Sequence, residues 1–227
     1  MSLGKLTVQA LLLTMAQVTV LAALLFIVAG TIDYWQAWVL IVIFAGCDSA
    51  IFIYLALKDP ALLERRRKAG LAKEQRPAQR VALSLARLSA LALLVVCGLD
   101  RRLMWSNVSP IVSVLGDLLV VLGIFILLLV FRANTYASSS IEVVEGQTVI
   151  PTGPYAVVRH PMYVAILVIM LGTPLGLGSW WGLLAGVGTS VAVIWRIVDE
   201  ETMLRSDLAG YSEYARRVRY RLVPFVW

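Results

Sequence analysis

The sequence predicts an all-α integral membrane protein with about five to six membrane-embedded helices, including a C-terminal helical hairpin. Of its 227 residues, 60% are hydrophobic and only 15% are charged, and the mean hydropathy is +0.84. A soluble domain carries roughly a quarter charged residues. Several apolar runs also reach the ~20 residues that a helix needs to cross a bilayer. We therefore expect one compact membrane domain.

The first two spans are expected at residues 8–29 and 35–57, joined by a short turn. Trp35 and Trp38 lie at the start of the second run, where tryptophan commonly anchors a helix at the membrane–water interface. Residues 1–5 precede an apolar run that is too long for the core of a signal peptide. We therefore expect a retained first span and not a cleaved leader.

The segment 58–80 is strongly basic and is predicted to be a cytoplasmic loop. Short loops rich in lysine and arginine face the cytoplasm. The N-terminus is expected on the same side, because two spans separate it from this loop. The basic residues of the segment are Arg65, Arg66, Arg67, Lys68, Lys73, Arg76 and Arg80.

The third and fourth spans are expected at residues 81–99 and 111–131. Arg87 interrupts the third span but lies near its cytoplasmic end, where a long side chain can reach the headgroups. Asp117 is costly in hydrocarbon unless it faces the bundle interior. We expect it to make a structural contact, with a proton or substrate role as the alternative. Together with Asp48, these are the only charges well inside the spans, too few for an ion path.

Residues 162–198 are again apolar, but glycine and proline at 172–178 divide them. Each half is shorter than a comfortable span. The sequence therefore predicts a helical hairpin whose bend, marked by Trp180 and Trp181, lies at the far membrane surface. The arginine-rich tail that follows would return to the cytoplasmic side.

Metal, disulfide and nucleic-acid chemistry are not indicated. Cys47 and Cys97 lie in apolar runs without histidine or cysteine neighbours at metal-ligand spacing, so we expect small buried side chains. The net charge is +6, but the basic residues lie in loops beside spans. This placement fits anionic lipid headgroups better than nucleic acid. Membrane lipid is therefore an expected partner, and no metal is expected.

The stretch 153–163, Gly-Pro-Tyr-Ala-Val-Val-Arg-His-Pro-Met-Tyr, holds the only histidine of the chain. Proline is favoured at the first helical position because it has no backbone N–H to lose and its φ is preset. His160-Pro161 is therefore predicted to begin a helix, with Tyr155 and Arg159 also at its positive end. An anionic group would be favoured there.

A second polar motif follows the hairpin. Arg196 and Glu200 are four residues apart, so on a helix they share a face and either form an ordinary ion pair or point into one pocket. They belong to a run with three consecutive acids, 199–201, which are costly at a membrane boundary unless solvated or matched. The segment 210–218 alternates aromatic and basic residues, which is typical of an interfacial amphipathic helix.

The order and spacing of these motifs resemble the isoprenylcysteine carboxyl methyltransferase family and its relatives, the membrane phospholipid methyltransferases. The resemblance covers residues 132–227 and rests on Gly-Pro-Tyr, Arg-His-Pro-Met-Tyr, Arg196 with Glu200, Gly-Tyr-Ser-Glu-Tyr and a closing Arg-Leu-Val-Pro. Residues 1–131 match only in being apolar. The resemblance implies an enzyme that moves a methyl group from S-adenosylmethionine to a lipophilic small molecule or prenylated substrate, with the carboxylate of an isoprenylcysteine-like molecule as the expected acceptor.

The resemblance also implies the site. Arg196 matches the position that meets the substrate, and a planar guanidinium suits a carboxylate; Arg159 is the second catalytic candidate. Displacement at a sulfonium methyl needs positioning more than acid–base chemistry. One cofactor contact expected within 138–145 is not assigned, because the loop length differs from that of eukaryotic members. The implied cofactor-binding residues are Gln147, Thr148, Val149, Ile150, Tyr155, His160, Pro161, Met162, Tyr163 and Glu200.

Two alternatives remain open. Membrane sterol and steroid reductases have a similar Arg-His-Pro helix entry and bind NADPH for hydride transfer; they would be expected to carry further basic or aromatic residues for the cofactor phosphates. A non-enzymatic membrane protein is the other alternative. The short loops favour a prokaryotic plasma membrane, with both termini and the cofactor pocket on the cytoplasmic face.

Overall fold

The computed structural model describes residues 3–68, 74, 76–137 and 146–227, and its regular elements are all helices. The predicted all-α membrane fold is confirmed. The elements are α1 (Leu3–Ala29), α2 (Trp35–Lys58), α3 (Pro60–Lys68), α4 (Pro77–Leu103), α5 (Pro110–Ala133), the 3-10 helix η1 (Gly153–Ala156), α6 (Pro161–Gly176), α7 (Trp181–Asp207) and α8 (Tyr211–Arg217).

Within these described residues, five helices are long and apolar enough to cross a membrane, namely α1, α2, α4, α5 and α7. The C-terminal hairpin is formed by α6 and α7. The prediction that both of its halves are short is correct for α6, with 16 residues, but wrong for α7, with 27. Residues 196–207 contain no glycine or proline and include good helix formers, so α7 continues beyond its apolar part.

Part of the basic segment 58–80, expected as a loop, is helical. α3 begins at Pro60, and the Asp59 carboxylate accepts a hydrogen bond from the Leu62 N–H at 2.9 Å. A capping aspartate followed by proline is a strong helix start. The loop prediction was wrong here because it weighed charge and overlooked this cap. Lys73 lies outside the described residues.

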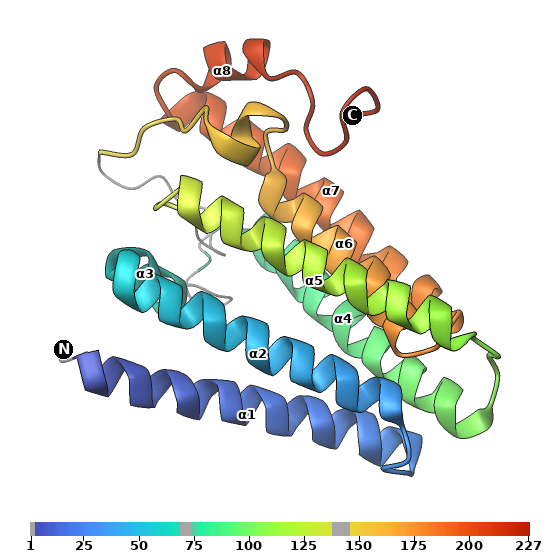
Figure 1. Ribbon diagram of the computed structural model, residues 1–227. Coiled ribbons are helices and arrows are strands. Elements are labelled where there is room, and N and C mark those ends of the chain that lie inside the picture. Colours follow the sequence, from blue (N-terminus) through green and yellow to red (C-terminus); the bar gives the residue numbers. More distant parts are fainter. Residues whose placement is uncertain (1–2, 69–73, 75, 138–145) are drawn as a thin grey trace.

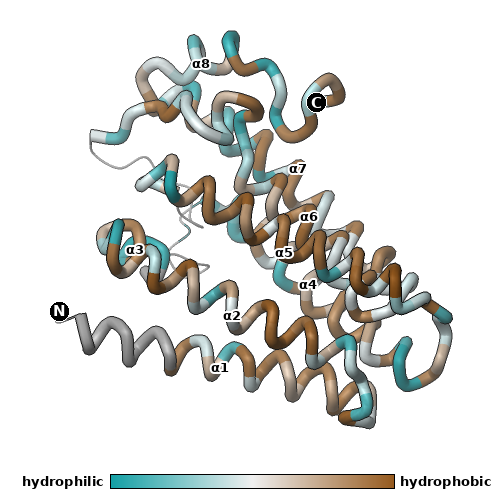
Figure 2. Tube along the Cα trace, viewed as in Figure 1, coloured by the Kyte–Doolittle hydropathy of each residue, from teal (hydrophilic) through white to brown (hydrophobic). Residues whose placement is uncertain are grey.

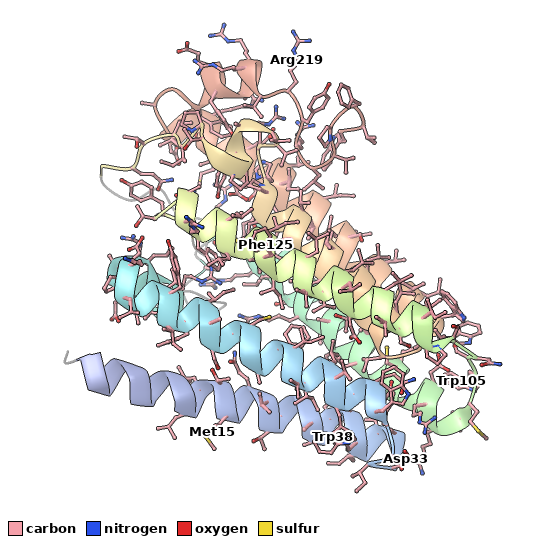
Figure 3. All side chains as sticks on the ribbon, viewed as in Figure 1. Met15, Asp33, Trp38, Trp105, Phe125 and Arg219 are labelled. Atoms are coloured by element: carbon pink, nitrogen blue, oxygen red, sulfur yellow. The ribbon has the colours of Figure 1, made fainter. Side chains whose placement is uncertain are left out.

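The helices run roughly along one direction, and the connections gather at two ends of the bundle (Figure 1). The α1–α2, α4–α5 and α6–α7 connections lie at one end, which we call the turn end. α3, η1 and α8 lie at the other, which we call the site end. Hydrophobic residues dominate the long helices and hydrophilic residues gather around α8 (Figure 2). Exposed apolar side chains such as Met15 and Phe125 lie between the two ends, where lipid would contact them (Figure 3).

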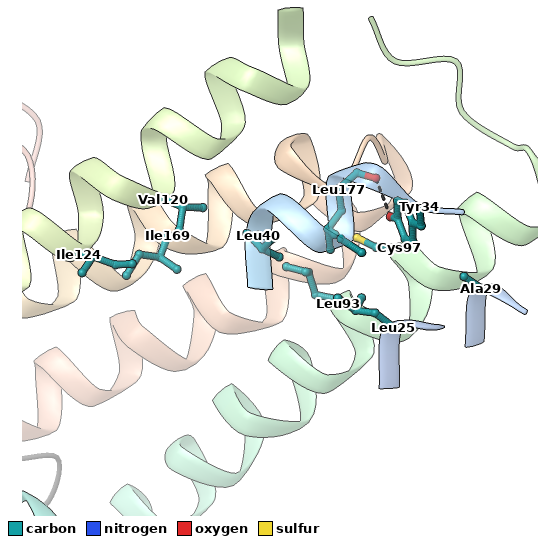
Figure 4. Close-up of a cluster of buried hydrophobic side chains, with 11 residues drawn as sticks. Leu25, Ala29, Tyr34, Leu40, Leu93, Cys97, Val120, Ile124, Ile169 and Leu177 are labelled. Atoms are coloured by element: carbon teal, nitrogen blue, oxygen red, sulfur yellow. Dashed lines mark hydrogen bonds between the residues drawn. The ribbon is translucent and has the colours of Figure 1, made fainter. Parts of the chain in front are cut away.

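Buried polar contacts hold the turn end together. Tyr34 Oη donates a hydrogen bond to the Leu177 carbonyl at 2.6 Å, beside an apolar core that also includes Cys97 (Figure 4). The Asp100 carboxylate accepts hydrogen bonds from the Ser106 N–H at 2.7 Å and from its hydroxyl at 2.6 Å. It also accepts one from the Ser179 hydroxyl. These contacts fix the start of α2, the end of α4 and the α6–α7 turn at one level.

Glycines allow α5 and α6 to pack at backbone contact. A Cβ atom on Gly116 would lie 2.6 Å from Leu175 C, and one on Gly172 would lie 2.6 Å from Gly116 O. A Cβ on Gly123 would lie 2.9 Å from Ala165 O. Small residues permit such close approach between membrane helices. The short helix α6 is thereby held along α5, and this sets the level at which its N-terminus meets the site end.

Gly116→Ala should destabilise the protein by roughly 1–3 kcal/mol, because the added methyl group forces the two backbones apart. The matched control is Gly46→Ala in α2, where no atom of another described helix lies within 4 Å of the added Cβ; alanine should be neutral or stabilising there. Thermal unfolding of the detergent-purified variants measures the difference. Equal midpoints for the two variants would contradict the close packing of α5 and α6.

Candidate functional site

The site end is built around the entry to α6. Gly153, at φ +61°, starts the tight turn of η1, and α6 begins at Pro161 with His160 as its cap residue, as the sequence predicted. The tail fixes this entry from outside. The Arg159 N–H donates to the Tyr220 carbonyl at 2.9 Å, and the His160 N–H donates to the Arg221 carbonyl at 3.0 Å.

Three consecutive acids near the C-terminal end of α7 have different sets of partners. Side chains of neighbouring helical residues diverge by about 100°, so the three carboxylates point in different directions. The acids and their partners are Asp199 with Arg76 at 2.7 and 3.0 Å, Glu200 with Tyr163 Oη at 2.7 Å, and Glu201 with Arg159 at 2.6 Å, Arg221 at 3.1 Å and His160 at 3.2 Å. Each of the three carboxylates therefore has a cation or a hydrogen-bond donor beside it. These partners offset the free-energy cost that the sequence analysis anticipated for three acids at a membrane boundary.

The Arg159 guanidinium forms its hydrogen bonds with other groups of the protein. Its Nε donates to Glu201, and its Nη1 donates to the carbonyls of Ala215, Val218 and Arg219 at 3.0 to 3.2 Å. The side chain is 6% exposed. One guanidinium thus connects α7, the end of α8 and the tail to the entry of α6.

Arg196 and Glu200 are linked through a tyrosine. Arg196 Nε donates to Tyr163 Oη at 3.2 Å, and this hydroxyl donates to Glu200 Oε2 at 2.7 Å. Arg196 is buried, and Glu200 is 22% exposed in its side chain. The sequence was compatible with an ordinary ion pair or with a shared pocket. In the structure Glu200 lines a cavity, whereas Arg196 does not line it and contacts Tyr163, which does.

The cavity lies at the site end, between the end of α5, η1, the start of α6, the end of α7 and α8. All ten residues predicted to bind a cofactor line it, and so does Arg159. Arg196 stands one hydrogen bond away from it. The further lining residues, which the sequence analysis did not select, are Asn134, Tyr136, Ala137, Met203, Leu204, Leu208, Tyr211 and Tyr214.

The α8 tyrosines face the cavity and not a membrane interface. Tyr214 Oη donates to the Tyr155 carbonyl at 2.8 Å, and Tyr211 and Tyr214 are both buried. The interpretation of segment 210–218 as an interfacial helix is therefore wrong for its aromatic face. Their i, i+3 spacing was the available signal, since it places both rings on one face of a helix.

Burial keeps the cavity tyrosines neutral. It raises the pKa of Tyr155 to about 12, and the Glu200 charge adds to the effect. It also raises the pKa of Tyr211, with the charges of Glu201 and Glu200 acting in the same direction. Asn134 Nδ2 donates to Tyr155 Oη at 3.0 Å. Near neutral pH both phenols are therefore available as hydrogen-bond donors.

The cavity suits a polar ligand with an apolar part. The Tyr211 hydroxyl is buried and has no hydrogen-bond partner within the described chain, so a bound group is a natural acceptor for it. Glu200 supplies a carboxylate, and Val149, Ile150 and Met162 supply apolar surface. In the described ranges, no group of three His, Cys, Asp or Glu side chains is placed to hold a metal ion.

These features define a multi-pass membrane protein with a cavity of mixed polar and apolar lining at one end of its bundle. Residues 111–208 match the family model of phospholipid methyltransferases. The match runs from the start of α5 to the end of α7, and it confirms the resemblance to membrane methyltransferases that the motifs gave. A comparison with curated proteins found no match.

Glu201→Gln should destabilise the fold by about 3–5 kcal/mol, because it leaves the buried Arg159 guanidinium without its counter-charge. Glu213→Gln is the control, since Glu213 is 72% exposed and lies 3.9 Å from Arg217; a surface pair of this kind contributes little. Chemical unfolding of both variants in detergent measures the loss. An unchanged midpoint for Glu201→Gln would show that the site end does not depend on this carboxylate.

Proposed function

We propose that the protein is an S-adenosylmethionine-dependent methyltransferase that methylates a lipophilic acceptor, with the carboxylate of an isoprenylcysteine-like molecule as the expected acceptor. The observation that carries the proposal is the gathering of all ten implied cofactor residues around one cavity, in a region that matches a membrane methyltransferase family. These residues come from the segment before η1, from η1, from α6 and from α7.

The chemistry of the cavity fits the cofactor. S-adenosylmethionine supplies an activated methyl group and carries positive charge on its sulfonium and its amino group. The Glu200 carboxylate, held by Tyr163 at 2.7 Å, would accept hydrogen bonds from the amino or ribose groups. The neutral phenols of Tyr155 and Tyr211 would donate to its oxygens. Met162, Val149 and Ile150 would pack against the aromatic faces of the adenine ring.

Arg196 is proposed to hold the acceptor. Its Nε contacts Tyr163 Oη, which is also bonded to Glu200, so an acceptor held at Arg196 would be next to the cofactor residues. A guanidinium binds a carboxylate with two parallel hydrogen bonds and so sets its orientation. Orientation at near-attack distance is the main requirement for methyl transfer to an acceptor that is already ionised.

Arg159 is proposed as a positioning residue. Its Nε and Nη1 are engaged by Glu201 and three backbone carbonyls. Its contribution would be to keep His160 and the start of α6 in place beside the cavity.

The NADPH alternative fits this cavity less well. A dinucleotide with several phosphates needs cations, and among the described residues that line the cavity only Arg159 and His160 are basic. Both contact Glu201, which offsets their charge.

Arg196→Lys should lower the turnover number at least tenfold while cofactor affinity stays within a factor of about two, because lysine cannot form the two parallel hydrogen bonds. Glu200→Gln should instead weaken cofactor binding by roughly tenfold, the value of one hydrogen bond to a charged group. The matched controls are Arg216→Lys and Glu213→Gln on the exposed side of α8. Calorimetry with S-adenosylhomocysteine and transfer of a labelled methyl group to a farnesylated cysteine analogue give the two readouts. Wild-type behaviour of both site variants would remove the site assignment.

The site end is proposed to face the cytoplasm of a prokaryotic plasma membrane, because the basic helix α3 lies there. In a Cys47→Ala, Cys97→Ala background, Ala61→Cys should react with an impermeant thiol reagent only from the cytoplasmic side. Asp33→Cys at the turn end, 95% exposed, should react only from outside. The reverse labelling pattern would invert the topology and separate the cavity from the cytosolic cofactor pool.

A further inference from the structure

A second cavity lies among the membrane helices. Its wall comes from α1, α2, α4 and α6, and it shares no residue with the cavity at the site end. It is apolar apart from Gln17, Asp48 and Thr173. Its α6 wall, Met170 and Thr173, begins seven residues beyond Tyr163, which is about 10 Å farther along the helix. The second cavity is therefore deeper in the bundle and separate from the methyl-transfer site.

Asp48 is the unusual residue of this wall. It lies near the middle of the membrane-spanning helix α2 and is exposed. No described residue forms a hydrogen bond or an ion pair with its carboxylate. Arg66 on α3 is the cation that acts on it electrostatically, but the Arg66 guanidinium stacks over the Phe131 ring at 4.1 Å. A carboxylate at such depth is costly and calls for a partner.

The polar atoms of the cavity are all able to accept hydrogen bonds. Asp48 offers a carboxylate and Gln17 an amide oxygen. Thr173 donates its hydroxyl hydrogen to the Ile169 carbonyl at 2.8 Å, so the lone pairs of that hydroxyl remain as acceptors. A primary ammonium group has three donors and the charge opposite to that of Asp48. An anionic headgroup would be repelled by the same carboxylate.

We propose that this cavity binds a lipophilic primary amine, with its ammonium group at Asp48 and its alkyl chain against the apolar wall. The proposal rests on a carboxylate that lies in an intramembrane cavity without a hydrogen bond or ion pair to any described residue, and on its charge complementarity with a cation. An ordinary lipid acyl chain would fill the apolar part but would give the Asp48 carboxylate no hydrogen-bond donor, and Arg66 acts on this carboxylate only from beyond ion-pair distance. The amine would enter from the bilayer, because the cavity lies at the level of the membrane spans.

The test uses the full-length protein in nanodiscs of zwitterionic lipid. The probes are a 16-carbon primary alkylamine with a photoreactive diazirine in its chain and the alcohol of the same chain. Labelling is measured by intact mass and mapped by peptide mass spectrometry. The variants are Asp48→Asn and, as a matched control, Asp117→Asn in α5, another intramembrane aspartate that lies outside the cavity wall.

The amine should label α1, α2, α4 or α6 saturably, and Asp48→Asn should weaken this labelling by roughly tenfold, the value of a charged hydrogen bond. Asp117→Asn should leave it unchanged. The alcohol should label the same helices more weakly and equally in wild type and Asp48→Asn, which also shows that the variant is folded. Binding of S-adenosylhomocysteine should be unaffected by Asp48→Asn, because the two cavities share no residue.

Three outcomes would overturn the proposal. Labelling by amine and alcohol that is equal, and equally retained in Asp48→Asn, would make the cavity a crevice for lipid chains. Labelling that does not saturate, or that maps to other helices, would show that the amine has no site there. Ala90→Phe places a ring in the cavity wall, so labelling that survives in this variant would likewise place the amine elsewhere.

Discussion

The buried carboxylate of Glu201 is the interaction on which the site end depends. It is 4% exposed, and it meets Arg159, His160 and Arg221 at 2.6 to 3.2 Å. A charge at such burial is tolerated only when it is fully paired. Its pairing joins four pieces of chain: the end of α7, the entry of α6, the end of α8 and the tail. The shape of the adjacent cavity depends on that junction, because Tyr163 lies near the start of α6 and Tyr211 and Tyr214 lie in α8.

Contacts at the turn end and along α5 and α6 set the position of this junction. Asp100, Tyr34 and Ser179 fix the turn end, and the glycines of α5 and α6 bring two backbones together along their length. His160, the cap residue of α6, is buried. It contacts Glu201 of α7 and the Arg221 carbonyl of the C-terminal tail, so these two segments enclose the polar entry of the helix.

Local chemistry made part of this predictable from the sequence. His160-Pro161 begins a helix because proline fits the first helical position, and the order of short motifs across the hairpin selected ten residues that the fold brings to one cavity. Tyr211 and Tyr214 were missed because alternating aromatic and basic residues suit either a lipid interface or a protein face, and only the fold decides. The carbonyl partners of Arg159 could not be foreseen either, since backbone groups at the end of α8 carry no sequence signal. α3 was missed because charge was weighed above its Asp59-Pro60 start.

The central claim is that the cavity at the site end holds S-adenosylmethionine. Calorimetric titration of the detergent-purified wild-type protein with S-adenosylhomocysteine, and separately with NADPH, tests it most directly. We expect saturable binding of S-adenosylhomocysteine at one site per chain and none of NADPH. Binding of NADPH alone would contradict this expectation. It would indicate a hydride-transfer enzyme, in which Arg196 would not have the role proposed for it.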